Sequence, residues 1–129
     1  MSDDDALRPV DLRFPRSLRL KSPWAIRQIF QEGVRRNGHG YALYGVRQSG
    51  DEERAGSRLG VVVSNRYGRG VHRNRLRRRL REAARLNRSA WPSNMDLVLR
   101  ATDRAPAEMD FNDLVSDLAR TLGRMTTKA

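Results

Sequence analysis

The strongest constraint on this chain is a segment so rich in arginine that only a thin apolar edge is left to pack. Ten arginines lie between residues 66 and 88, against a single acidic residue, Glu82. On a helical wheel, Leu76, Leu80 and Ala83 form a narrow apolar stripe. The opposite side carries what we call the cationic arc, which consists of Asn74, Arg77, Arg78, Arg81, Arg85 and Arg88. The pattern predicts a helix from near residues 71–73 to about 87, with Arg73 and Arg79 reaching around the edges of the stripe.

The charge of this segment favours a polyanionic partner. Like charges three and four residues apart on a helix repel by a few tenths of a kcal/mol per pair, and one glutamate cannot offset them. The whole chain carries a net charge of +11, but residues 12–100 alone hold 21 basic and six acidic residues, whereas both ends are slightly acidic. Nucleic acid is the simplest partner for such a block. A solvated helical face on a merely basic protein is the alternative.

The composition also excludes several kinds of protein. The chain has no cysteine, so disulfide scaffolds, thiolate metal sites and cysteine nucleophiles are excluded. Its two histidines cannot build a multi-histidine metal site, and no apolar run is long enough to span a membrane. The acidic first residues are unlike a signal peptide. We expect a soluble, cytoplasmic protein of one domain.

The remaining elements follow from caps and periodicity. Ser22 before Pro23 predicts the start of a helix that ends near Gly33. Asp110 is the expected N-cap of a closing helix with one apolar face. The predicted order is helix 23–32, strand 41–46, strand 59–63, the arginine-rich helix, strand 95–100 and helix 111–125.

The connections are expected to be short and polar. Residues 48–57 are interpreted as a hairpin loop, and residues 65–70 as a glycine-rich loop. Residues 1–15 are expected to be a flexible tail and residues 126–129 a frayed end. One domain over residues 16–125 remains.

The order of residues resembles a known family. The segment 58–64 reads RLGVVVS, a basic glycine-containing loop follows, and residues 73–83 read RNRLRRRLREA. This succession resembles the protein subunit of bacterial ribonuclease P, which carries an arginine–asparagine–arginine signature on its second helix. Further matching positions, over about residues 16–125, are Arg19-Leu20, Phe30, Gly33, the strand 41–44 and the strand 96–100. Ile26 departs from the family, which has an aromatic residue there.

The resemblance implies a fold and a function. The implied fold is α+β, a two-layer sandwich with a helix, three strands, a helix, a strand and a helix, and a left-handed strand–helix–strand crossover. The implied role is to bind the catalytic RNA of ribonuclease P and the 5′ leader of precursor tRNA during leader removal. The RNA and its magnesium ions perform the hydrolysis, so no catalytic or metal-binding residue is expected in this chain. No membrane association and no obligate protein partner are expected.

The resemblance also assigns residues to two surfaces. The residues expected to bind the catalytic RNA are Arg66, Arg69, Arg73, Asn74, Arg75, Arg77, Arg78, Arg81 and Arg85. The candidates for a leader-binding cleft beside the first helix are Ile26, Phe30, Tyr41, Tyr44 and Tyr67. Strand alternation allows only one of Tyr41 and Tyr44 to face that cleft. Each assignment has an alternative. Phe30 could simply pack in the core, and Asn74 could simply satisfy the start of the helix. The loop 65–70 could be a plain turn from strand to helix.

Two other functions remain open from the residues alone. A ribosomal or general structured-RNA-binding protein would share the basic helix without the aromatic cleft. A DNA-binding regulator could place the arginine-rich helix in a major groove, but no dimerising heptad or helix-turn-helix pattern accompanies it.

Overall fold

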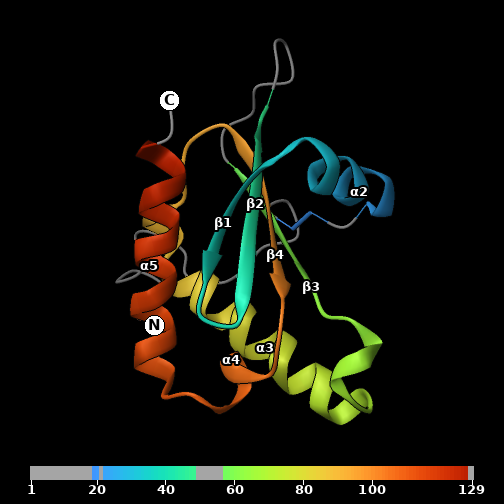
Figure 1. Cartoon of the computed structure of the whole chain (residues 1–129). Coiled ribbons are helices and arrows are strands. Elements are labelled where there is room, and N and C mark those ends of the chain that lie inside the picture. Colours follow the sequence, from blue (N-terminus) through green and yellow to red (C-terminus); the bar gives the residue numbers. More distant parts are fainter. Residues whose placement is uncertain (1–18, 21, 49–56, 128–129) are drawn as a thin grey trace, which may run out of the picture.

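The computed structural model describes residues 19–20, 22–48 and 57–127, which form one four-stranded sheet with helices on both faces (Figure 1). The strand order is β1-β2-β4-β3. The elements are α2 (Pro23–Glu32), β1 (Val34–Gly38), β2 (Tyr41–Arg47), β3 (Arg58–Val62), the 3-10 helix η3 (Asn65–Tyr67), α3 (Gly70–Leu86), the 3-10 helix η4 (Arg88–Ala90), β4 (Met95–Ala101), α4 (Ala105–Glu108) and α5 (Phe111–Thr127).

The two central strands are buried on both faces. Because successive residues of a strand point to opposite sides, Leu43 and Leu97 pack toward α3 and α5, while Ala42, Tyr44 and Val98 pack toward α2. The sheet and the α3–α5 layer form the sandwich, and α2 covers part of the opposite face (Figure 1). The α+β sandwich implied by the family resemblance is confirmed.

The connection from β3 through α3 to β4 joins two parallel neighbouring strands. It is left-handed in the view of Figure 1, against the usual right-handed rule for such crossovers. The three strands before α3 agree with the order implied by the resemblance. The order inferred from the residue pattern lacked one of them, β1, as well as the short helix α4.

The hairpin of this fold lies before β2, where the residue pattern did not place one. β1 and β2 pair antiparallel around a turn at His39 and Gly40, and Gly40 has a φ of 84°, which favours glycine. The prediction that residues 48–57 form a hairpin loop is wrong, because β4 lies between β2 and β3 in the sheet. Residues 49–56 of that segment lie outside the described residues.

Helix ends agree with the capping signals in the sequence. The Ser22 hydroxyl accepts a hydrogen bond from the Ala25 N–H (3.2 Å), and the Gly33 N–H donates to the Ile29 carbonyl (2.8 Å). The Asp110 carboxylate accepts hydrogen bonds from two N–H groups in the first turn of α5. That helix continues to Thr127, two residues beyond the predicted end.

The predicted tail 1–15 and residues 128–129 lie outside the described part of the chain. Among the helices that the structure describes, none combines the length and apolarity needed to cross a bilayer.

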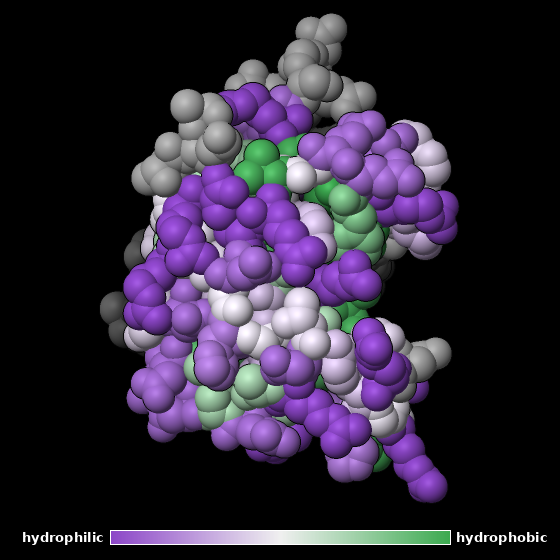
Figure 2. Space-filling view, viewed as in Figure 1, coloured by the Kyte–Doolittle hydropathy of each residue, from purple (hydrophilic) through white to green (hydrophobic). Residues whose placement is uncertain are grey.

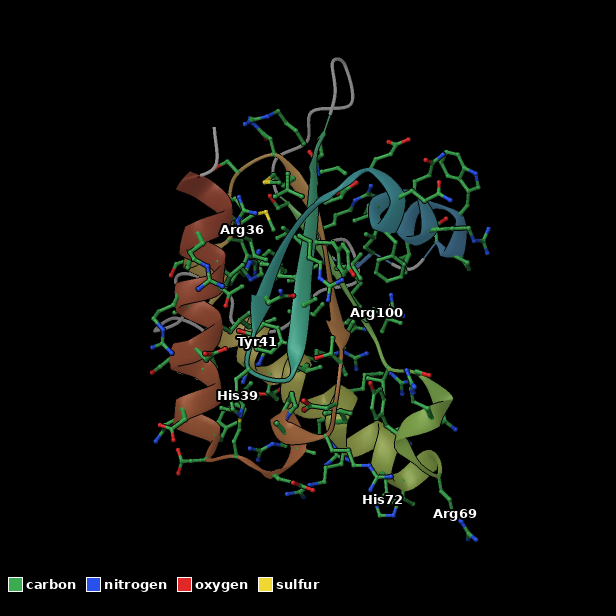
Figure 3. The ribbon with its side chains drawn as sticks, in the orientation of Figure 1. Arg36, His39, Tyr41, Arg69, His72 and Arg100 are labelled. Carbon is green, nitrogen blue, oxygen red and sulfur yellow. The ribbon has the colours of Figure 1, made fainter. Side chains whose placement is uncertain are left out.

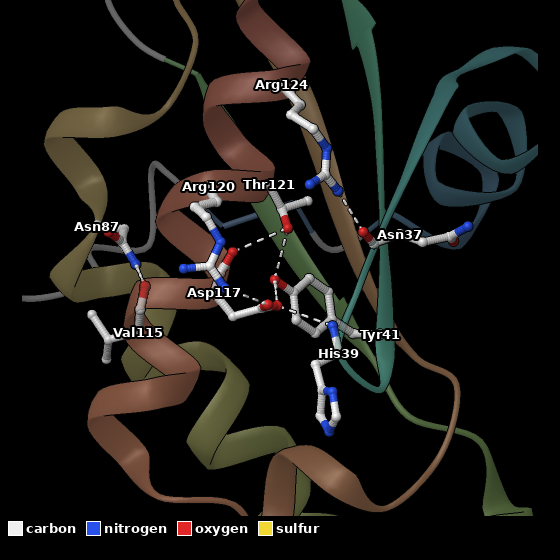
Figure 4. A network of polar contacts seen from close by, with 9 residues as sticks. All are labelled: Asn37, His39, Tyr41, Asn87, Val115, Asp117, Arg120, Thr121 and Arg124. Atoms are coloured by element: carbon white, nitrogen blue, oxygen red, sulfur yellow. Dashed lines mark hydrogen bonds and ion pairs between the residues drawn. The ribbon is translucent and has the colours of Figure 1, made fainter.

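A partly buried polar network fixes the β1–β2 hairpin to α5 (Figure 4). The Tyr41 hydroxyl donates to the Asp117 carboxylate (2.7 Å) and lies 3.0 Å from the Thr121 hydroxyl. The His39 backbone N–H donates to the same carboxylate oxygen of Asp117 (2.9 Å), and the Arg124 guanidinium donates to the Asn37 carbonyl. The hairpin is thus held by side chains from two successive turns of α5.

The network changes the proton affinity of both acids within it. Burial raises the pKa of the Tyr41 phenol, so it remains a protonated donor. Burial also acts to raise the pKa of Asp117, but hydrogen bonds from Tyr41 and the His39 N–H, together with Arg120, outweigh it and place that pKa below its usual value. The phenol and the carboxylate therefore suit each other as donor and acceptor.

Removing the Tyr41 hydroxyl tests this network. We expect Tyr41→Phe to lower the free energy of unfolding by about 1–3 kcal/mol, because it leaves a partly buried carboxylate without one donor. Tyr44→Phe is the matched control, since the Tyr44 hydroxyl makes no hydrogen bond within the described residues. Urea unfolding of both variants measures the difference. Equal effects of the two substitutions would contradict the role of the network.

Candidate nucleic-acid interface

The helix α3 packs through a narrow edge, as its sequence predicts. Leu76, Leu80 and Ala83 are buried together with Ala84, and they contact the sheet and α5. The helix begins at Gly70 without a side-chain cap and with no acidic residue in its first turn. Its positive dipole end therefore adds to the field of the arginines rather than being neutralised.

The cationic arc faces away from the core and contains little compensating charge. Asn74 and Arg78 are exposed, and Arg78 makes no hydrogen bond or ion pair within the described residues. Arg77 donates to the side-chain oxygen of Asn74 (2.9 Å), which orients its guanidinium along the helix. The acidic residue of the helix, Glu82, is paired with Arg85 (2.6 Å). The arc can therefore receive several phosphates at once.

Three arginines of α3 that flank the arc are partly used within the fold. Arg79 donates to the backbone carbonyls of Pro106 (2.7 Å) and Met109, and its guanidinium lies 5.4 Å from the centre of the Phe111 ring. This side chain ties α3 to the junction of α4 and α5. The Nε atoms of two predicted RNA-binding residues also bond local carbonyls, Arg73 to Gly68 (3.2 Å) and Arg75 to Ala107 (3.2 Å).

The loop before α3 extends the basic surface. Arg66 and Arg69 are exposed, and Figure 3 shows Arg69 extending away from the body of the molecule. The Ser64 hydroxyl accepts a hydrogen bond from the Arg66 N–H (3.2 Å), and Gly68 has a φ of 111°. These features turn the chain from β3 into α3 within a few residues.

A second surface lies on the α2 side of the sheet and combines aromatic rings with arginines. The rings of Phe30 and Tyr44 meet edge to face at 4.8 Å. The Arg100 guanidinium lies 5.1 Å from the Phe30 ring centre, and the Arg35 guanidinium lies 5.4 Å from that of Tyr44. Each of these two rings therefore carries a cation on its face.

The same side of the sheet contains an open hollow. Figure 2 shows a notch between α2 above and the start of α3 below, with hydrophobic residues at its upper edge. The hollow is lined by Arg35, Tyr44, Ser64, Arg66, Tyr67 and Arg100, among others. Of the predicted cleft residues, Tyr44 and Tyr67 line this hollow, and Phe30 contacts Tyr44 beside it.

Two predicted cleft residues lie elsewhere. The assignment of Tyr41 to the cleft is wrong, because its ring points to the α5 face, is 1% exposed and is held by Asp117. Alternation places Tyr44 on the α2 face instead, as the sequence allowed for one of the two. Ile26, on α2, packs against the cluster around Tyr44 and lines a different groove at the β3 edge.

Sequence reasoning missed two arginines of the hollow. Arg35 lies on β1, which was not predicted as a strand. Arg100 is the residue before the end of β4. The alternation of Leu97 and Leu99 against Val98 and Arg100 was the signal that could have placed it on the α2 face.

Among the described residues, no group of three histidine, aspartate or glutamate side chains is placed to hold a metal ion. Trp91 packs against the main core and donates its indole N–H to the Ala84 carbonyl (3.0 Å). Trp24 is 66% exposed on α2.

Comparison with known proteins gives one consistent result. The family model described as Ribonuclease P matches residues 14–126. The chain is 32% identical over 112 residues to the ribonuclease P protein component of Acidothermus cellulolyticus, covering 87% of this chain and 91% of that one. It is 38% identical over 97 residues to the ribonuclease P protein component of Ruegeria pomeroyi, covering 71% of this chain and 74% of that one. The fold matches the RNase P protein from Thermotoga maritima with a TM-score of 0.70 and 27% identity, over 82% of this chain and 96% of that one.

Substitutions of Arg79 and Arg78 test whether the first arginine stabilises the fold while the second is available to bind RNA. We expect Arg79→Gln to lower the free energy of unfolding by about 1–3 kcal/mol, because two carbonyls lose their donor. Arg78→Gln should change it by less than about 0.5 kcal/mol. Arg78→Gln should instead weaken binding to a structured RNA and lower its salt slope by about one. Thermal melting and RNA titration of both variants measure this, and a reversed pattern would contradict the assignment.

Proposed function

The chain belongs to the ribonuclease P protein family, and from this premise we propose that it binds the catalytic RNA of ribonuclease P and the 5′ leader of precursor tRNA. In this proposal the protein assists the endonucleolytic removal of the leader, which gives the mature 5′ end of the tRNA. The observation that carries the proposal is the cationic arc of α3, whose side chains face away from the core on a helix with a single acidic residue, Glu82.

Phosphate binding follows from the charge of the arc. Arginine forms bidentate hydrogen bonds with phosphate oxygens, and each neutralised phosphate releases counterions into solution. With roughly 6–10 phosphate contacts, the affinity for the catalytic RNA falls by about 10³–10⁵ between 50 and 200 mM salt. The residues proposed to make these contacts are Arg66, Arg69, Arg73, Asn74, Arg75, Arg77, Arg78, Arg81 and Arg85.

The hollow on the α2 side suits a single strand. Aromatic rings that stack on unpaired bases contribute about 1–3 kcal/mol per base. Phe30 and Tyr67 are half-buried and offer ring surface, whereas Tyr44 is 6% exposed and acts by supporting Phe30. Arg35 and Arg100 would bind the phosphates between the bases. We propose that the leader lies here.

The protein contributes binding and orientation in this proposal. Magnesium ions held by the catalytic RNA and the substrate supply the hydrolytic chemistry when bound. The side chains of this chain bind the leader and hold the precursor against the RNA, so their effect falls on substrate affinity and on the magnesium concentration that the reaction needs. We place this activity in the cytoplasm, where we expect the protein to act.

The aromatic hollow separates this proposal from its nearest alternative. A general binder of structured RNA needs the arc but has no use for ring surfaces flanked by arginines. The presence of both surfaces in one small domain favours a protein that holds a folded RNA and a single strand together.

Cleavage of precursor tRNA tests the proposal directly. With the catalytic RNA at low magnesium, we expect the chain to raise the cleavage rate and to increase the affinity for precursor over mature tRNA. Asn74→Ala should weaken binding of the catalytic RNA by about tenfold, since it removes one polar group and the partner that orients Arg77. Arg120→Gln on α5 is the control, with little change expected. A chain that alters neither magnesium dependence nor precursor affinity would overturn the proposed function.

A further inference from the structure

A short piece of N-terminal chain extends the sheet at β3. Arg19 forms a parallel bridge with Leu59, and the Leu20 N–H donates to the Leu59 carbonyl (3.1 Å). Gly60 permits this approach, because a Cβ at that position would lie 2.5 Å from the Leu20 carbonyl oxygen. The Leu20 side chain is buried among the residues beneath α2. The main-chain pairing with Leu59 and the burial of Leu20 thus fix the position of the Arg19 backbone.

This arrangement forms a groove between the two surfaces described above, and it shares Arg81 with the cationic arc. The groove crosses the β3 edge, with α2 on one side and α3 on the other. Its lining includes Arg19, Leu20, Ile26, Gly60, Val61 and Arg81. It measures about 310 Å³, at the lower end of the range for ligand sites. An apolar floor therefore lies between two arginines that are 62 positions apart in the sequence.

The electrostatics of the groove favour an anion. Arg81 makes no hydrogen bond or ion pair within the described residues. Burial, followed by the nearby charges of Arg19 and Arg77, lowers the pKa of Arg81, while Glu82 acts in the opposite direction. Glu82 is itself paired with Arg85. Arg81 therefore lies near two other guanidinium groups, and an anion bound in the groove would offset the positive charge around it.

We propose that this groove binds one phosphodiester group of an RNA strand, held jointly by the guanidinium groups of Arg19 and Arg81. The apolar floor receives the attached ribose, against Ile26 and Val61. The paired N–H donors of two guanidinium groups match the oxygens of one phosphate. The apolar floor favours a nucleotide over a free inorganic anion. The inference rests on the proposed function and adds a contact that joins the α2 side of the molecule to the cationic arc.

If Arg19 and Arg81 contact the same phosphate, the effects of substituting them on RNA affinity should not be independent. The experiment measures the affinity of the full chain for the catalytic RNA with Arg19→Gln, Arg81→Gln and both substitutions. Each single substitution should weaken binding by about tenfold, the loss typical of one charge-assisted hydrogen bond. The double variant should lose much less than the product of the two, because either substitution already breaks the clamp. Arg47→Gln removes one exposed charge at the far end of β2 and is the matched control, with a change of about twofold or less.

A second measurement identifies the source of the phosphate. Affinity of the assembled ribonucleoprotein for precursor tRNA is compared with and without a leader. A coupled loss in binding of the catalytic RNA assigns the phosphate to that RNA, and a coupled loss only with leader-containing precursor assigns it to the leader. Both results support the groove. Circular dichroism melting checks that the variants fold, and Arg81→Lys, which keeps the charge without the fork, should weaken binding less than Arg81→Gln.

The opposing results are distinct from failure of the proposed function. If the wild-type chain binds both RNAs but the two substitutions multiply, or match Arg47→Gln, the shared phosphate is overturned and the proposed function stands. If the wild-type chain binds neither RNA, the proposed function is overturned. The proposal that the groove binds RNA is then overturned as well.

Discussion

The packing of α3 through Leu76, Leu80, Ala83 and Ala84 is the contact on which the rest of this structure depends. It is the apolar contact that holds a strongly cationic helix on the domain, and the two alanines let α5 approach closely. Because the stripe is so narrow, most of the helix circumference remains available to solvent. The packing that holds the helix in place therefore also leaves its arginines facing solvent.

The arginines of this chain have divided roles that composition alone does not distinguish. Arg79 bonds two backbone carbonyls at the α4–α5 junction, and Arg58 forms a two-point ion pair with Asp96 between neighbouring strands (3.0 and 2.8 Å). Arg78 and Arg69 point outward instead. The first kind stabilises the positions of helices and strands, and the second kind is the one that we propose to contact RNA.

Local signals in the sequence predicted most elements, because caps and apolar periodicity act within a few residues. β1 was missed because its sequence, VRRNG, has one apolar side chain and no visible alternation. The hairpin was misplaced because strand adjacency depends on β4, which lies far away in the sequence. The family resemblance supplied the third strand and the crossover, which residue patterns could not.

The candidate site was predictable in outline and not in detail. The cationic arc follows from helical geometry, so its outward face could be predicted. Whether Tyr41 or Tyr44 faces α2 depends on which side α5 covers, and the nearness of Arg19 to Arg81 depends on the edge of a sheet. These are long-range consequences of packing. Arg100 is the one part of the hollow that alternation along its own strand could have indicated.

The central claim is that the exposed face of α3 lies against the catalytic RNA, and site-specific crosslinking tests it most directly. The chain contains no cysteine, so Arg78→Cys and Arg120→Cys each provide one attachment point for a photoreactive group. The account predicts efficient crosslinks from position 78 of α3 to the catalytic RNA, suppressed by high salt, and few from position 120 of α5. Equal yields from both positions, or crosslinks from position 120 alone, would contradict it.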